Sequence, residues 1–230
     1  MNTWVKVARY NLVGPGNYLL LPWILPFSFA VGAVTARHSH LATGYLITFF
    51  IYFAVLGMQT VGRSLPFGLT LGASRRSFYA GTALLGMALA LVSGLVLTAL
   101  QAIERATDGW GLSMQFFRVN YLLNGPWYAT WLTSAVGLFA VFAYGMWHGV
   151  VNYRWGALGT LAFLAAQVIV VVAVHAVATS EHWHTASTVA ASAGTRSSGG
   201  LTALGLTGIV AALAVLVLVG GQATIRRATV

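Results

Sequence analysis

The feature of this sequence that most constrains its fold is a series of long apolar stretches that contain no Lys, Arg, Asp or Glu. Each is close to the length of about 20 mostly apolar residues that an α-helix needs to cross a bilayer. Because lipid offers no partners to backbone N–H and C=O groups, each stretch is predicted to be helical. The six predicted spans are residues 18–36, 41–61, 78–103, 126–147, 157–180 and 199–221.

The composition also predicts a surface that faces lipid. Only 7% of the residues are charged and 58% are hydrophobic, whereas a soluble domain carries about 25% charged residues. The fold class is therefore predicted to be all-α, a polytopic membrane protein. The net charge of +9 does not indicate nucleic acid as a partner, because the basic residues fall in the gaps between apolar stretches and form no stripe.

The whole chain, 1–230, is expected to form a single transmembrane domain. Residues 1–17 would be an interfacial segment with a short helix, 18–221 the six spans, and 222–230 a tail. Lys6 and Arg9 before an apolar stretch also suit a signal peptide. That alternative is not favoured, because 18–36 is long for one and five more spans follow.

Lysine and arginine predict the orientation of these spans. Segments 1–17, 62–77, 148–156 and 222–230 would share one side of the membrane, and the other connections would hold the remaining four cations and all three acids. Because Lys and Arg are enriched in cytoplasmic loops, both termini are predicted to be cytoplasmic. The cations on that side are Lys6, Arg9, Arg63, Arg75, Arg76, Arg154, Arg226 and Arg227.

Several kinds of chemistry are missing from the sequence. With Lys6 as its one lysine and no G-x-x-x-x-G-K-[ST] motif, the chain cannot bind ATP in the usual way. No span holds a carboxylate, so a proton- or sodium-coupled carrier would lack its usual intramembrane acid. Cysteine is absent, which excludes thiolate metal sites. We therefore expect no cofactor bound by this chain and no enzymatic activity of its own.

A few polar side chains lie within predicted spans, namely Gln59, Gln167 and His175. The two glutamines either join helices by hydrogen bonds worth about 0.6–2 kcal/mol or line a substrate path, and the sequence leaves both open. For His175, a neutral histidine that is hydrogen-bonded to a neighbouring helix is favoured over a proton relay or substrate contact, because the spans hold no partner acid. The pair His182 and His184, with Glu181, offers metal ligands. A metal site needs three or four converging ligands, so a plain interfacial loop is favoured there.

Small residues four apart predict close helix packing at two places. Ala90 and Gly94 lie in the third span, and Gly208 and Ala212 lie in the sixth. Small residues at this spacing let helix backbones approach each other. Gly and Ala are abundant in this chain, so chance matches of the pattern are also expected.

The break at 62–77 has an order of residues that fixing topology alone does not require. Apolar residues alternate from Leu65 to Leu71, a Gly72-Ala73-Ser74 turn follows, and Arg75 and Arg76 come next. Residues 65–71 are predicted to form a short interfacial helix that offers an apolar knob to a soluble partner. Ser74 is predicted to cap the following helix.

This stretch resembles a loop of a known family. Residues 67–82 read F-x-x-x-L-G-x-S-R-R-x-F-x-x-G-T, which is similar to the loop between spans two and three of bacterial type-2 ABC exporter permeases. Tyr153–Gly156 is similar to the short "R-[FW]-G" break of that family, and the six-span layout covers nearly the whole chain. The loop 181–198, rich in Ala, Ser, Thr and Gly, departs from relatives with short outer re-entrant helices.

The resemblance implies that the chain is a permease subunit in a bacterial plasma membrane. A separate ATP-binding subunit would bind ATP and Mg²⁺, and a second permease copy, identical or paralogous, would complete the path for an amphiphilic drug, peptide or lipid. A short cytoplasmic coupling helix would dock on the ATPase. The implied coupling residues are Leu65, Phe67, Leu69, Leu71, Gly72, Ser74, Arg75 and Arg76.

Two other classes share the predicted topology. A non-transporting membrane sensor or immunity protein would need no ATPase, and an adjacent ATPase gene would favour export over this alternative. An intramembrane enzyme is not favoured, because no intramembrane acid, cysteine or Ser-His motif supports it.

Overall fold

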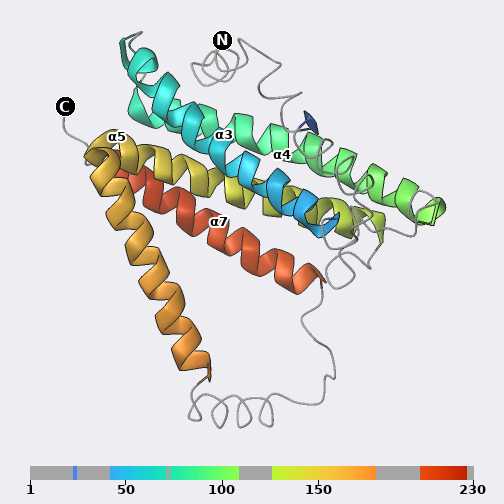
Figure 1. Ribbon diagram of the computed structural model, residues 1–230. Coiled ribbons are helices and arrows are strands. Elements are labelled where there is room, and N and C mark those ends of the chain that lie inside the picture. The colour runs from blue at the N-terminus through green and yellow to red at the C-terminus, as the bar shows by residue number, and fades with distance from the viewer. Residues whose placement is uncertain are drawn as a thin grey trace.

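The computed structural model of this chain describes residues 23–24, 42–70, 72, 74–108, 126–179 and 203–226. Throughout these residues the regular structure is helical and no strand occurs, which confirms the all-α prediction. The described residues form four long helices, which Figure 1 labels. They are α3 (Ala42–Thr70), α4 (Arg75–Ala106), α5 (Trp127–Thr179) and α7 (Ala203–Arg226).

The stretches predicted as the second to sixth spans overlap these helices in the sequence. Within the described residues, three helical segments are long and apolar enough to cross a membrane: Arg75–Ala106, Trp127–Val170 and Thr207–Ile225. The fourth and fifth spans are joined in α5, because the expected break at 148–156 is a bend at Gly156 (φ 66°, ψ −162°) and not a loop. The first span, apart from Trp23 and Ile24, and the interfacial segment lie outside the described residues.

The separate coupling helix between spans two and three is not observed, so that part of the prediction is wrong. Instead, α3 continues through Leu65 and Pro66 to Thr70. The physical reason is tertiary packing. Leu65 is 1% exposed and belongs to the same buried cluster as Phe78 of α4 and Ile225 of α7. This burial holds the segment in line with α3 although Pro66 removes one backbone donor.

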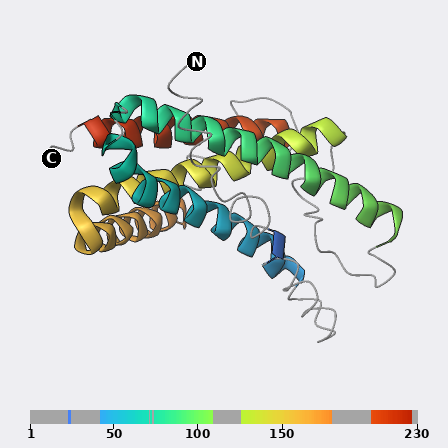
Figure 2. The same ribbon diagram turned by 90° about the horizontal axis from the view of Figure 1, so that it is seen from above.

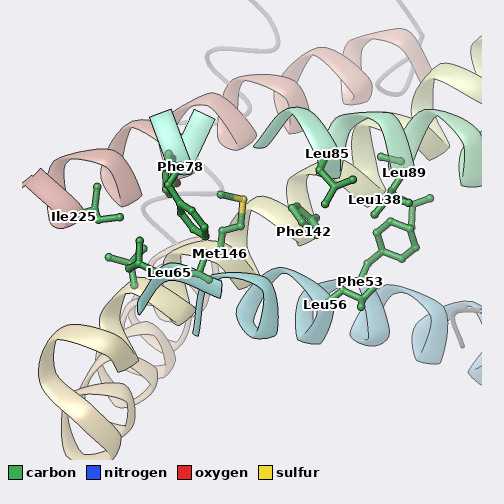
Figure 3. Close-up of a cluster of buried hydrophobic side chains, with 14 of the residues drawn as sticks. Phe53, Leu56, Leu65, Phe78, Leu85, Leu89, Leu138, Phe142, Met146 and Ile225 are labelled. Carbon is green, nitrogen blue, oxygen red and sulfur yellow. The ribbon is translucent and has the colours of Figure 1, made fainter. Parts of the chain in front are cut away.

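The N-terminal arm of α5, residues 127–155, is the centre of the bundle. It packs against α3, α4 and α7, and Figure 2 shows it between α3 on one side and α4 and α7 on the other. In the close-up of Figure 3, Phe142 of this arm lies between Leu56 of α3 and Leu85 of α4, and Met146 lies between Leu65 of α3 and Phe78 of α4. The interior is apolar and aromatic, so dense side-chain packing joins the helices.

The backbones of α3 and α5 touch where glycines replace side chains. A Cβ atom on Gly57 of α3 would overlap the carbonyl oxygen of Phe142, and one on Gly145 of α5 would overlap that of Ala54. A Cβ on Gly149 would lie 2.8 Å from the carbonyl oxygen of Met58. Gly145 and Gly149 form the G-x-x-x-G spacing that lets membrane helices approach closely.

The two predicted small-residue pairs have different surroundings. A Cβ on Gly94 would lie 3.0 Å from the backbone nitrogen of Ala135, and Ala90 is buried, so this pair faces α5. Gly208 has no atom within 4 Å of its Cβ position, and Ala212 is exposed. Close packing is therefore found at the first pair and not, among the described residues, at the second.

The glycine contact makes a prediction about stability. Gly145→Ala should destabilise the protein by roughly 1–3 kcal/mol, because overpacking forces the two backbones apart. The measurement is the melting temperature of the purified protein in detergent. Gly62→Ala is the matched control, since Gly62 also lies in a helix but has open space at its Cβ position. Equal melting temperatures for Gly145→Ala and Gly62→Ala would contradict the backbone contact.

Candidate coupling junction and intramembrane polar cluster

The junction between α3 and α4 is a tight, capped turn. The N–H of Gly72 donates to the carbonyl oxygen of Leu69 at 3.0 Å, and Gly72 has φ 78°, a conformation that glycine adopts without steric cost. The Ser74 hydroxyl oxygen accepts the backbone N–H of Ser77 at 3.1 Å and so caps α4. The predicted cap at Ser74 is therefore observed, and the motif residues that precede Arg75 direct the chain from one helix into the next.

The predicted coupling residues divide into buried and accessible groups. Leu65 is buried and Leu69 packs against the core, so neither offers the free apolar knob that the sequence predicted. Gly72, Ser74 and Arg76 are exposed, and Arg75 is half-exposed. The side chain of Phe67 and the whole of Leu71 lie outside the described residues.

Five arginines, including Arg226 as the last residue of α7, gather at the same end of the bundle. At this end α3 finishes, α4 begins, α5 bends and α7 finishes, as Figure 1 shows. Arg63 lies on α3, Arg75 and Arg76 open α4, and Arg154 lies at the bend of α5. We call this the arginine end. The acids in the described part of the chain, Glu104 and Asp108, lie at the opposite end of α4.

Contacts at the arginine end tie the junction to α7 and to the bend. The Tyr79 hydroxyl of α4 donates to the carbonyl oxygen of Leu218 at 3.3 Å. Arg154 donates from Nη1 to the carbonyl oxygen of Thr224 at 3.5 Å. Ile225 packs in the core cluster that includes Leu65. A displacement of the junction must therefore move or break contacts with both α5 and α7.

A polar cluster joins the two arms of α5 across the bend. The Tyr144 hydroxyl donates to Oε1 of Gln167, and Nε2 of Gln167 lies 3.4 Å from Nε2 of the buried His148. The ring of Phe163 packs against those of Trp147 and His148, with each pair of centroids 4.9 Å apart. Gln167 thus joins helical segments by hydrogen bonds, one of the two roles that the sequence left open.

The three predicted path residues are not brought together by the described structure. Gln59 is exposed on α3, Gln167 lies in the cluster, and the side chain of His175 is outside the described residues. Sequence reasoning missed Tyr144 and His148. His148 falls one residue beyond the predicted span 126–147, so it was counted with a connecting segment, although its spacing of four from Tyr144 places both on one helix face.

No metal centre emerges from the described residues, which contain no group of three or more His, Cys, Asp or Glu that could hold an ion. The candidate ligands Glu181, His182 and His184 lie outside them.

Comparison with known proteins adds no relative. No protein-family model, curated protein or solved structure matches the chain. The likeness to exporter permeases therefore depends on the motif at residues 67–82 and on the helical layout.

The polar cluster makes a second prediction. Gln167→Leu should lower the stability of the protein by about 0.6–2 kcal/mol, because it removes hydrogen bonds between the arms of α5. Gln59→Leu makes the same chemical change at an exposed position and should leave stability nearly unchanged. The check is the melting temperature of both variants in detergent. A larger loss for Gln59→Leu than for Gln167→Leu would show that the cluster does not stabilise the bend.

Proposed function

We propose that this chain is the membrane-spanning permease subunit of an ATP-driven exporter of the type-2 ABC family. The observation that carries the proposal is the form of residues 67–82. The family-like motif makes a glycine-ended helix, a tight turn and a serine-capped helix that begins with two arginines. Two adjacent arginines at an exposed helix start suit a surface that meets another protein.

In this proposal the chain crosses the bacterial plasma membrane six times, with both termini in the cytoplasm. The helices long and apolar enough to span a bilayer support the membrane location. The gathering of Arg63, Arg75, Arg76 and Arg154 at one end supports the orientation, because Lys and Arg are enriched on the cytoplasmic side. The arginine end would then face the cytoplasm.

The junction would couple the permease to a separate ATPase subunit. That partner would bind ATP and Mg²⁺, since this chain has no phosphate-binding loop. Arg75 and Arg76 would pair with carboxylates of the partner, which guanidinium groups bind with two parallel hydrogen bonds. Leu65 and Phe78 would transmit a movement of the junction to the core, because they pack in the same buried cluster as Ile225.

The apolar surface of the described bundle supports the proposed substrate class and the proposed second copy. Leu216 is 66% exposed and Val219 58% exposed, and both lie on α7, away from the bend of α5. Surfaces of this kind meet lipid or another membrane helix. A path between apolar helices suits an amphiphilic drug, peptide or lipid, and a second permease copy would form its other wall.

If the junction couples this chain to an ATPase, substitutions at the junction should reduce stimulation of the ATPase and leave membrane insertion of the chain unchanged. The double variant Arg75→Ala/Arg76→Ala, and Phe67→Ala, should insert normally but lose most of the stimulation of an ATPase encoded beside this chain. The measurement is ATP hydrolysis by the co-purified complex in lipid vesicles. Arg105→Ala removes a cation from the opposite end of α4 and is the control.

Two outcomes would contradict the proposal. One is unchanged stimulation in the double variant. The other is a wild-type chain that binds no ATPase in any nucleotide state, which would favour a non-transporting sensor or immunity protein.

A further inference from the structure

The two arms of α5 meet at a bend on the side of the bundle. At Gly156 the backbone takes φ 66° and ψ −162°, which interrupts the helix without ending it. Beyond this residue the C-terminal arm, 157–179, leaves the bundle at a steep angle, as Figure 1 shows. The two arms therefore diverge from a shared apex at the arginine end.

An apolar cavity of about 550 Å³, wide open to the outside, lies at this apex. Its size is within the range of about 300–1,000 Å³ that is typical of ligand pockets. Water would find few partners on such walls, so an apolar occupant is favoured. The lining residues are Val151, Trp155, Leu158, Gly159, Ala162 and Phe163.

A cation lies beside this apolar cavity. The guanidinium carbon of Arg154 is 4.5 Å from the ring centroid of Trp155, which lines the cavity. The bond from Arg154 to the carbonyl oxygen of Thr224 uses one of the five N–H donors of the guanidinium. Tyr153 and Trp155 are exposed, and such aromatic side chains lie at the headgroup level of a membrane.

We propose that the cavity between the two arms of α5 binds one phospholipid with an anionic headgroup. An acyl chain fills the cavity between the arms, and Arg154 binds the phosphate. Basic pockets between membrane helices on the cytoplasmic side recognise anionic headgroups in this way. The inference uses the cytoplasmic orientation of the arginine end that the proposed function gives, but it does not depend on ATP coupling.

Charge and exposure favour a lipid over a second copy of the chain. The described residues place five arginines and no acid at this end, so two copies brought together here would set like charges against each other. Leu158 and Leu161 of the C-terminal arm are 81% and 62% exposed, so the side of the cavity that they form would face the hydrocarbon of a bilayer. An anionic lipid satisfies both the cation and the apolar walls.

The bound lipid would also contact a residue that packs against the polar cluster. Phe163 lines the cavity and packs against the ring of His148, which lies 3.4 Å from Gln167. An acyl chain in the cavity therefore contacts a residue that helps to set the position of the C-terminal arm.

The test is lipid retention by the purified full-length protein. The protein is exchanged into vesicles of equal parts phosphatidylglycerol and phosphatidylcholine, extracted in mild detergent, and examined by native mass spectrometry. We expect the wild type to retain one phosphatidylglycerol molecule in preference to phosphatidylcholine. Arg154→Gln should lower this retention about fivefold, the effect of one interfacial cation, and Arg154→Lys should largely preserve it.

Two further variants separate the cavity from general surface charge. Ala162→Trp should fill the cavity and reduce retention without a change of charge, and it is expected to fold because Ala162 is exposed. Arg63→Gln removes an exposed arginine that does not line the cavity and should retain lipid like the wild type.

Four results would overturn the lipid site, and none of them requires the ATPase; three concern lipid retention. They are no preference for the anionic lipid, an equal loss in Arg63→Gln and Arg154→Gln, and unchanged retention in Ala162→Trp. A tightly held second copy in place of lipid would also contradict it.

Discussion

The backbone contact between α3 and α5 is the interaction on which the rest of the described bundle depends. Helices in lipid gain little from the hydrophobic effect and are held together by close packing. Gly57, Gly145 and Gly149 allow that packing by removing side chains where the two helices meet. Phe142 and Met146 are thereby brought into the core, where α4 and α7 pack against the same arm of α5.

The arginine end combines the two features to which we assign function. The capped turn that begins α4 and the bend at Gly156 lie at this end and are joined through α7, by Ile225 in the core and by the bond from Arg154 to Thr224. A force on the junction and a lipid in the cavity between the arms of α5 would therefore act on the same group of packed helices.

Much of the fold was predictable because lipid restricts the choices of the chain. Uncharged stretches of sufficient length predicted the helices, and Ser74 predicted the start of α4 from the chemistry of a cap. The features that the sequence did not predict depend on the tertiary structure. Burial of Leu65 extends α3 beyond the expected loop, the bend at Gly156 joins two spans, and His148 pairs with a residue 19 positions away.

The orientation of the arginine end is the claim that single-cysteine labelling tests most directly, since the chain has no cysteine of its own. Thr70→Cys marks the end of α3 at the arginine end, and Ala106→Cys marks the end of α4 at the opposite end. In intact cells an impermeant maleimide should label Ala106→Cys at once, and Thr70→Cys only after the membrane is opened. The reverse pattern, or labelling of both from the same side, would contradict the account.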